Sequence, residues 1–267
     1  MRHSYCGLPP DPSDLLIRWK IDPILITALV VIWAAYTLGV NRRATIPAWR
    51  QWCFHLGWLT TSLSLITPLC ALSVSLFSAR VGQHMIMSLI GAPLVMLGDP
   101  GAAFGALAPR TARALSQSST VRSMRSPMGS ALLFGLALWV WHSPAPYDAT
   151  FHNWMIYWLM HLSVYGSALL VWGVMIDTRR ETAFASIAVG TISTLQMTFL
   201  GALITLTPQM LYAPHAVTPL AWGMTQASDQ QLGGLIMWVP GCTIFLAFTL
   251  VALGRLIADR PELENSR

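Results

Sequence analysis

The sequence predicts an all-α integral membrane protein: a seven-transmembrane-helix bundle with its N-terminus outside and its C-terminus in the cytoplasm. Three observations predict this fold class. Hydrophobic residues make up 54% of the 267 residues and charged residues only 10%, whereas a soluble domain carries about a quarter charged residues. Seven apolar stretches are long enough, or nearly long enough, to cross a bilayer. The basic residues gather in alternate connections between these stretches.

The seven predicted helices follow from the need for roughly 20 apolar residues to cross about 30 Å of hydrocarbon. The third and fourth stretches are short, so we expect these helices to be less tilted or to begin in the interface. Prolines inside the stretches are compatible with membrane helices, because neighbouring groups satisfy the freed backbone. The predicted helices are residues 21–40, 54–77, 83–98, 129–143, 153–176, 184–207 and 232–256.

The chain is expected to form one membrane domain with two tails. Residues 1–20 are predicted to be a polar periplasmic tail, residues 21–256 the transmembrane domain and residues 257–267 a cytoplasmic tail. No apolar core follows the first arginine, so we expect no cleaved signal peptide. The four cysteines lack CxxC spacing and predict neither a zinc site nor a thioredoxin motif. Cys6 is interpreted as a lone thiol, incidental or a mobile ligand on the tail.

The distribution of lysine and arginine predicts the orientation. The connections after the first, third and fifth helices and the region after the seventh carry twelve basic residues, namely Arg42, Arg43, Arg50, Arg110, Arg113, Arg122, Arg125, Arg179, Arg180, Arg255, Arg260 and Arg267. The opposite side carries only Arg2, Arg18, Lys20 and Arg80. Because the basic side is normally cytoplasmic, seven crossings place the N-terminus outside.

With this orientation, the ionisable side chains of the membrane region gather on the outer side. His84 opens the third predicted helix, His142 closes the fourth, and His161 lies within the fifth. Asp229 opens the seventh helix. Ionisable groups at membrane depth are costly and usually face the bundle interior. We therefore expect a polar cluster in the outer half of the bundle.

The chemistry of this cluster suits copper, because imidazole and thioether ligands favour it and thioether favours the cuprous state. The predicted metal ligands are His84, His142, His161, Asp229, Met87 and Met237. A structural interpretation stands beside this one. A histidine near a helix end is often an interfacial or capping residue, and a methionine in an apolar helix is more often core filler than a ligand. Spacing alone leaves His161 either a hydrogen-bonding group or a metal ligand.

Four stretches carry a family resemblance. In chain order they are QHMIMSLIGAPLVMLGDP, WHSPAPYDATFHN, MHLSVYGSALLVWGVMI and SDQQLGGLIMWVPG. Together they resemble the cytochrome c oxidase assembly factor CtaG family, multi-spanning bacterial membrane proteins associated with caa-type oxidases. The resemblance covers residues 45–255. It implies a seven-helix bundle needed to build a haem–copper oxidase, with copper handled or inserted on the outer side.

The chain departs from this family pattern at two positions. The pattern often reads HMxxHM at the start of the third helix and HxxxH in the fifth, and a histidine pair at i, i+4 can chelate a metal. Arg80 and Tyr157 occupy the first position of each pair here, which leaves His84 and His161. A metal site must then be assembled across helices, and the cation of Arg80 one turn from His84 opposes metal binding.

The leading functional hypothesis is a non-enzymatic assembly factor for a haem–copper cytochrome c oxidase in the bacterial inner membrane. Such a protein would hold copper transiently. Its expected partners are an oxidase subunit, a periplasmic copper chaperone and membrane lipid. No nucleic-acid partner is expected, because the basic residues lie between apolar runs. An enzyme is disfavoured, since the sequence has no nucleophile–base motif, paired carboxylates or phosphate loop.

Two other functions stay open. Two histidines facing each other across the bundle would make the protein a b-type membrane cytochrome. No second level of histidines near the inner side supports an electron path, so haem is not expected. A copper transporter is the other alternative, although the sequence shows no internal repeat of the kind that transporters usually have.

Overall fold

The computed structural model describes residues 4–42, 46–177, 179 and 182–258, and this part of the chain is all-α without a named strand. The longer helices are α1 (Pro23–Arg42), α2 (Ala48–Ile66), α4 (Phe77–Ile86), α9 (Pro127–His142), α11 (Trp154–Met175), α12 (Ala183–Leu206) and α13 (Gln226–Ala258). The shorter helices are α3 (Pro68–Ser75), α5 (Ala92–Leu97), α6 (Pro100–Leu107), α7 (Pro109–Gln117), α8 (Ser119–Arg125) and α10 (Pro144–His152). Single turns are η1 (Leu15–Ile17), the π-helix η2 (Met87–Gly91), η4 (Ala213–His215) and η5 (Thr218–Trp222).

The helix lengths support a multi-pass membrane protein. Within the described residues, five helices are long and apolar enough to cross a membrane: α1, the continuous α4–η2–α5 unit, α11, α12 and α13. The bent pair α2–α3 makes a sixth if it counts as one span. Helix α9 is apolar but has only 16 residues. Each of the seven predicted stretches therefore contains helix, while the count of seven crossings stays a prediction.

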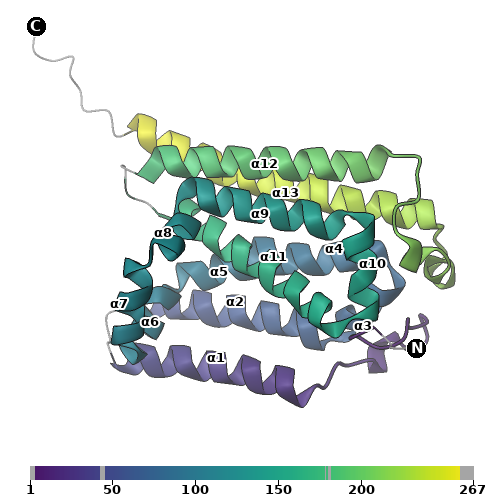
Figure 1. Cartoon of the computed structure of the whole chain (residues 1–267), viewed down its shortest axis with the longest axis horizontal. Helices are drawn as coiled ribbons and strands as arrows, with labels where there is room; N and C mark the ends of the chain where they lie inside the picture. Colours follow the sequence, from purple (N-terminus) through teal and green to yellow (C-terminus); the bar gives the residue numbers. More distant parts are fainter. Residues whose placement is uncertain (1–3, 43–45, 178, 180–181, 259–267) are drawn as a thin grey trace, which may run out of the picture.

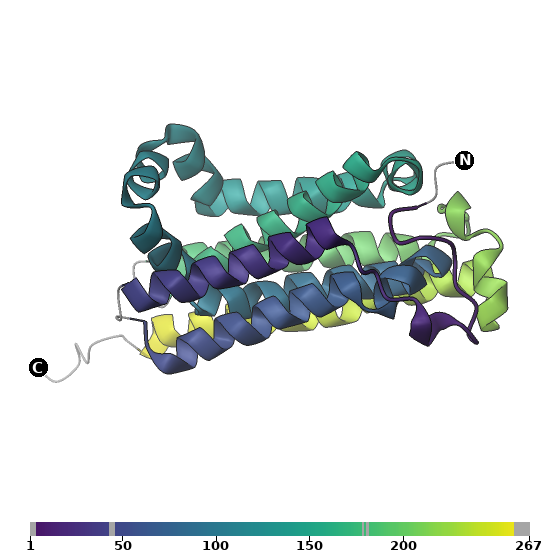
Figure 2. The ribbon, with the colours of Figure 1, turned by 90° about the horizontal axis from the view of Figure 1, so that it is seen from below.

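The helices run side by side, and their connections gather at two opposite ends (Figure 1, Figure 2). We call one of them the disulfide end; it is formed by residues 4–20, α3, α10 and residues 207–225. The arginine end is formed by α6, α7, α8 and the C-terminal end of α13. The connection between the third and fourth predicted helices thus folds into three short helices, α6, α7 and α8.

Two breaks correct the predicted boundaries of the second and third helices. Proline disfavours helical geometry in the residue before it, and Thr67 before Pro68 is extended, so α2 and α3 meet at 52°. Leu76 is extended as well. The third helix therefore begins at Phe77 and runs for 21 residues to Leu97, instead of the short stretch 83–98.

The π-helix η2 explains how Pro93 fits inside this span. In a π turn, the carbonyl of residue 88 would accept a hydrogen bond from residue 93, but proline has no N–H. The indole Nε1–H of Trp172 on α11 donates to the Ser88 carbonyl instead, at 2.7 Å. The Ser88 carbonyl, which Pro93 leaves without an N–H donor, thus holds α11 against the third span through this hydrogen bond.

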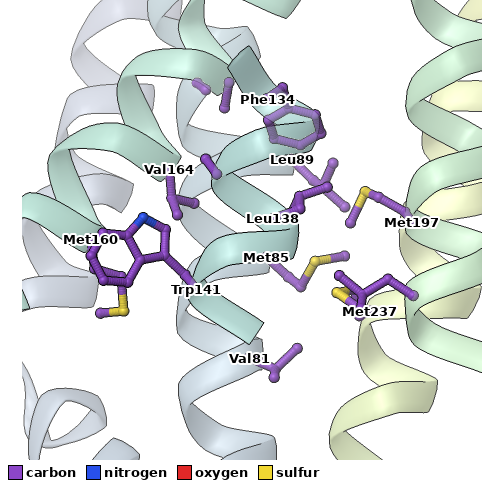
Figure 3. Packing of buried hydrophobic residues seen from close by; sticks show 14 of the residues in the cluster. Val81, Met85, Leu89, Phe134, Leu138, Trp141, Met160, Val164, Met197 and Met237 are labelled. Atoms are coloured by element: carbon purple, nitrogen blue, oxygen red, sulfur yellow. The ribbon is translucent and has the colours of Figure 1, made fainter. Parts of the chain in front are cut away.

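Helix α4 has two different faces, and this sets the place of the functional side chains. Val81, Met85 and Leu89 recur every four residues and pack into the main core with residues of α9, α12 and α13 (Figure 3). Arg80 and His84 form the adjacent stripe, which is buried against α10 and α11.

Candidate metal centre

Helices α4 and α11 bring His84 and His161 into contact. Each histidine lies seven residues after the first residue of its helix, about 10 Å below the disulfide end at 1.5 Å rise per residue. The two imidazole rings meet edge to face with centroids 5.0 Å apart. Both side chains are buried, with 8% and 3% of their surface exposed. His84 therefore does not open its helix, as the sequence suggested, but stands inside the bundle.

One nitrogen atom of each histidine in this pair has no hydrogen-bond partner. His161 Nδ1 lies 3.0 Å from the Tyr157 carbonyl, which can only accept, so Nδ1 carries the proton and Nε2 presents a lone pair. Nε2 of His161 and Nε2 of His84 are both buried without a hydrogen-bond partner. Buried polar atoms are nearly always satisfied. We therefore regard this pair as two ligand atoms without a protein partner.

His142, the last residue of α9, lies near the pair but is held by its own helix. Its Nδ1 donates to the Leu138 carbonyl at 2.8 Å, and its carbonyl accepts from the Tyr212 hydroxyl at 3.0 Å. It is close enough that a positive charge on its ring would disfavour a second positive charge on His84. In the described part of the chain, however, no three His, Cys, Asp or Glu side chains converge as metal ligands would. The structure thus brings two of the three predicted histidines together.

Asp229 has a different partner from the one the sequence suggested. Its carboxylate is fully buried and accepts from the backbone N–H groups of Phe77 at 2.7 Å and Ser78 at 3.0 Å, and from the Ser78 hydroxyl. It therefore caps the N-terminus of α4 from across the bundle. Since His84 lies two turns deeper on α4, Asp229 sits about 10 Å above the pair.

The two predicted methionine ligands lie in separate clusters. Met237 packs with Met85 and Met197 in the main core (Figure 3), where Gly241 leaves room for Met197 and Met85. Met87 packs instead with Leu25 and Leu65. Met85, next to His84 in the chain, lies on the core-facing stripe of α4 and so does not join the pair either.

Arg80 is the main charge near the pair, and it does not lie in an outer loop as expected. It is buried on α4 with 1% exposure, and one nitrogen donates to Thr150 Oγ1 at 2.8 Å. The guanidinium carbon lies 4.2 Å from the ring centroid of Phe151 and 5.1 Å from that of Tyr147. Its Nε and second terminal nitrogen have no hydrogen-bond partner. Aromatic faces partly stabilise this cation.

Cys6 forms a disulfide with Cys70, so the interpretation of Cys6 as a lone thiol was wrong. The Tyr157 hydroxyl lies 3.2 Å from Cys6 Sγ and 3.7 Å from Cys70 Sγ. The Tyr157 ring in turn lies against the His161 ring, tilted by 37° and with centroids 4.2 Å apart. One signal was available: the predicted topology puts both cysteines on or near the outer side.

The fold and this buried polar pair define a multi-span helical membrane protein with a candidate site inside the bundle. The chain belongs to the family described as cytochrome c oxidase caa3 assembly factor, whose sequence model matches residues 31–259. The resemblance drawn from the sequence motifs is thereby confirmed. In the same comparisons, no curated protein and no solved structure matches the chain.

Proposed function

We propose that this protein supports assembly of a caa3-type cytochrome c oxidase by holding one Cu(I) ion between His84 and His161, on the outer side of the inner membrane. The observation that carries the proposal is the pair of buried, unpartnered Nε2 atoms on touching rings. Family membership supports the oxidase, and the geometry supports the ion.

The surroundings of the pair favour Cu(I) over a divalent metal. Neutral imidazole is a copper ligand. Arg80, one turn away, repels a bound cation, and this repulsion is twice as large for a charge of two as for a charge of one. A two-ligand site next to a fixed cation binds weakly, which suits an ion that must be passed on.

The touching rings favour a single ion over haem. A b-type haem needs its porphyrin plane between two axial histidines. Ring centroids 5.0 Å apart in edge-to-face contact leave no room for such a plane. The copper-binding alternative is thus the better fit to this pair.

Seven crossings with the N-terminus outside complete the proposal. Disulfides form in oxidising compartments such as the periplasm, and the Cys6–Cys70 bridge supports placing that end outside. The arginine end carries Arg110, Arg113 and Arg122, which supports placing it in the cytoplasm. Helix α9 then spans the membrane with help from α8 and α10 at its two ends.

The direct test is an anaerobic Cu(I) titration of the detergent-purified protein against a competing chelator. We expect one equivalent bound by the wild type and lost in His84→Ala and in His161→Ala. His152→Ala is the matched control, because His152 is exposed at the same end and contacts Asp148. Loss in His142→Ala as well would add that histidine to the ligand set. A folded wild type that binds no copper would refute the copper site.

The oxidase role has a separate test in the host bacterium. Deletion of the gene should lower oxidase activity and the copper content of the purified oxidase, and the wild-type gene should restore both. The His84→Ala gene should restore neither. A deletion strain with normal oxidase activity and copper content would contradict the assembly role.

A further inference from the structure

The Cys6–Cys70 disulfide lies directly above the proposed copper pair. Tyr157 lies between them, since its hydroxyl contacts both sulfurs and its ring lies against the His161 ring. The sulfurs, Tyr157, His161 and His84 therefore form one continuous path from the disulfide end into the bundle. A disulfide used only to hold the N-terminal segment would not need this position.

The N-terminal segment has several other anchors besides the disulfide. The Tyr5 ring stacks on Tyr157 with centroids 4.8 Å apart, and its hydroxyl donates to Asp22 at 2.6 Å. The Ser75 hydroxyl donates to the Pro10 carbonyl at 3.0 Å. These contacts do not depend on the sulfur–sulfur bond. Reduction of the disulfide would therefore leave two thiols side by side.

The spacing of the two cysteines fits a cuprous ion. Their Cα atoms are 5.5 Å apart. Two metal–sulfur bonds of about 2.3 Å, the length known for zinc thiolates, span at most about 4.6 Å. Rotation of the two side chains opens this distance without moving the backbone. Soft thiolates select Cu(I).

The charges around the sulfurs also fit such an ion. A Cu(I) ion held by two thiolates carries a net charge of minus one. Lys20 Nζ lies 4.3 Å from the ring centroid of Tyr5, the residue before Cys6. The Arg80 guanidinium carbon lies 5.8 Å from the ring centroid of Tyr157. Two cations thus lie just behind the aromatic rings that border the sulfur pair.

We propose that Cys6 and Cys70, once reduced by a dithiol, form a second Cu(I) site on the outer side of the histidine pair. The dithiol transfers two electrons and two protons to the disulfide and becomes a disulfide itself. Cu(I) then displaces the two thiol protons and keeps its oxidation state. The oxidised protein lacks this outer site, so the redox state of the bridge sets how many copper ions the protein holds. Passage of copper from the sulfurs to the histidines rests on the proposed function, whereas binding at the sulfurs does not.

The test compares oxidised and reduced protein in the same anaerobic Cu(I) titration. The full-length chain carries Cys53→Ser and Cys242→Ser, because these two cysteines are free. A phosphine reduces the bridge and is removed before copper is added. We expect the reduced protein to bind one equivalent more than the oxidised protein. The additional equivalent should disappear in Cys6→Ser and persist in His161→Ala.

The outcomes separate this inference from the proposed function. Equal stoichiometry in both redox states overturns the sulfur site, whatever the histidines bind. A sulfur equivalent without any binding by the oxidised protein overturns the histidine site alone. X-ray absorption at the copper edge needs neither the Cys6 nor the His161 variant: the reduced protein loaded with Cu(I) should show sulfur ligands. Nitrogen ligands alone would refute the proposal.

Discussion

Asp229 illustrates how one carboxylate serves a helix terminus instead of a metal. Both of its oxygens accept hydrogen bonds at the start of α4, from Phe77 and Ser78. The first N–H groups of a helix have no partner inside the helix, and these ones are buried. Asp229 on α13 satisfies them and so fixes the height of α4, and with it the height of His84.

Substitution of Asp229 should therefore affect stability more than copper binding. Asp229→Ala is expected to lower the free energy of unfolding by about 2 kcal/mol, because buried N–H groups lose an acceptor. Asp229→Asn keeps one acceptor oxygen and should cost less. Thermal unfolding in detergent measures both, with the exposed Asp148→Ala as control. An unchanged midpoint in Asp229→Ala, or loss of copper without loss of stability, would contradict the capping role.

His215 in η4 is a buried histidine held neutral outside the spanning helices. Its Nδ1 donates to the Ser75 carbonyl at 3.2 Å, so its Nε2 accepts from the Tyr147 hydroxyl at 2.7 Å. Burial, and next the positive charge of Arg80, lower the pKa of His215 to about 3. Arg80 and Tyr147 are the charged and titratable groups that face it.

This lowered pKa predicts acid sensitivity. In the unfolded chain the pKa of a histidine is about 6.5. Below this pH the unfolded state therefore binds a proton at His215, whereas the folded state leaves the imidazole neutral. The contribution of His215 to the free energy of unfolding is fully present above about pH 6.5 and is smaller by about 2 kcal/mol at pH 5. His215→Asn should therefore unfold with a smaller pH dependence between pH 7.5 and pH 5 than the wild type. Parallel pH profiles would show that His215 takes up its proton without unfolding.

At the scale of the helices, close backbone contacts decide how α2 meets the broken third span. A Cβ atom at Gly57 would lie 2.6 Å from the Val95 nitrogen and 2.8 Å from the Gly91 carbonyl oxygen. Small residues permit this close approach of membrane helices. The contact places α2 against the π-helix that accommodates Pro93.

Gly57→Ala should therefore destabilise the protein, although alanine is the better helix former. The added methyl group meets backbone atoms that cannot move aside, and overpacking of this kind costs about 1–3 kcal/mol. Gly166→Ala on α11 is the matched control, because a Cβ atom there meets nothing within 4 Å. The thermal midpoint in detergent should fall for Gly57→Ala and hold or rise for Gly166→Ala. Equal midpoints would contradict the close packing.

At the scale of the whole molecule, the separation of the two ends links orientation with function. The N-terminal segment and α3 lie at one end, and the arginine-bearing helices α7 and α8 lie at the other (Figure 1). The disulfide joins the N-terminal segment to α3, and the candidate copper pair lies on the first turns of α4 and α11 near that end. Delivery of copper on the periplasmic side therefore requires the disulfide end to face outward.

Single-cysteine labelling in cells tests this orientation. In a chain with Cys53→Ser and Cys242→Ser, a membrane-impermeant maleimide should label Gln209→Cys in intact cells. It should label Ser116→Cys only after the membrane is opened. Gln209 is exposed in the loop after α12, and Ser116 is exposed on α7. The reverse pattern would place the candidate copper pair on the cytoplasmic side and contradict its proposed role.

The residues show which parts of the site could be predicted. The positions of His142 and Asp229 at helix ends followed from apolar lengths, and His84 and His161 were expected on the same side of the membrane. The depth of His84 was not predictable, because it depends on the break at Leu76 that starts α4 at Phe77. The pairing of Cys6 with Cys70 was missed, because 64 residues separate them and only the packed N-terminal segment brings them together.

The sequence by itself determined the membrane class, the apolar segments, the charge asymmetry and, through its motifs, the family. These properties depend on composition and on which residues follow one another along the chain. Each apolar segment favours insertion into the bilayer through its own length and composition. Only the tertiary structure decided that His84 meets His161, that Asp229 caps α4 and that Tyr157 lies between the disulfide and the histidines. Those contacts join residues from different helices, and helix rotation and depth are set by side-chain packing across the whole bundle.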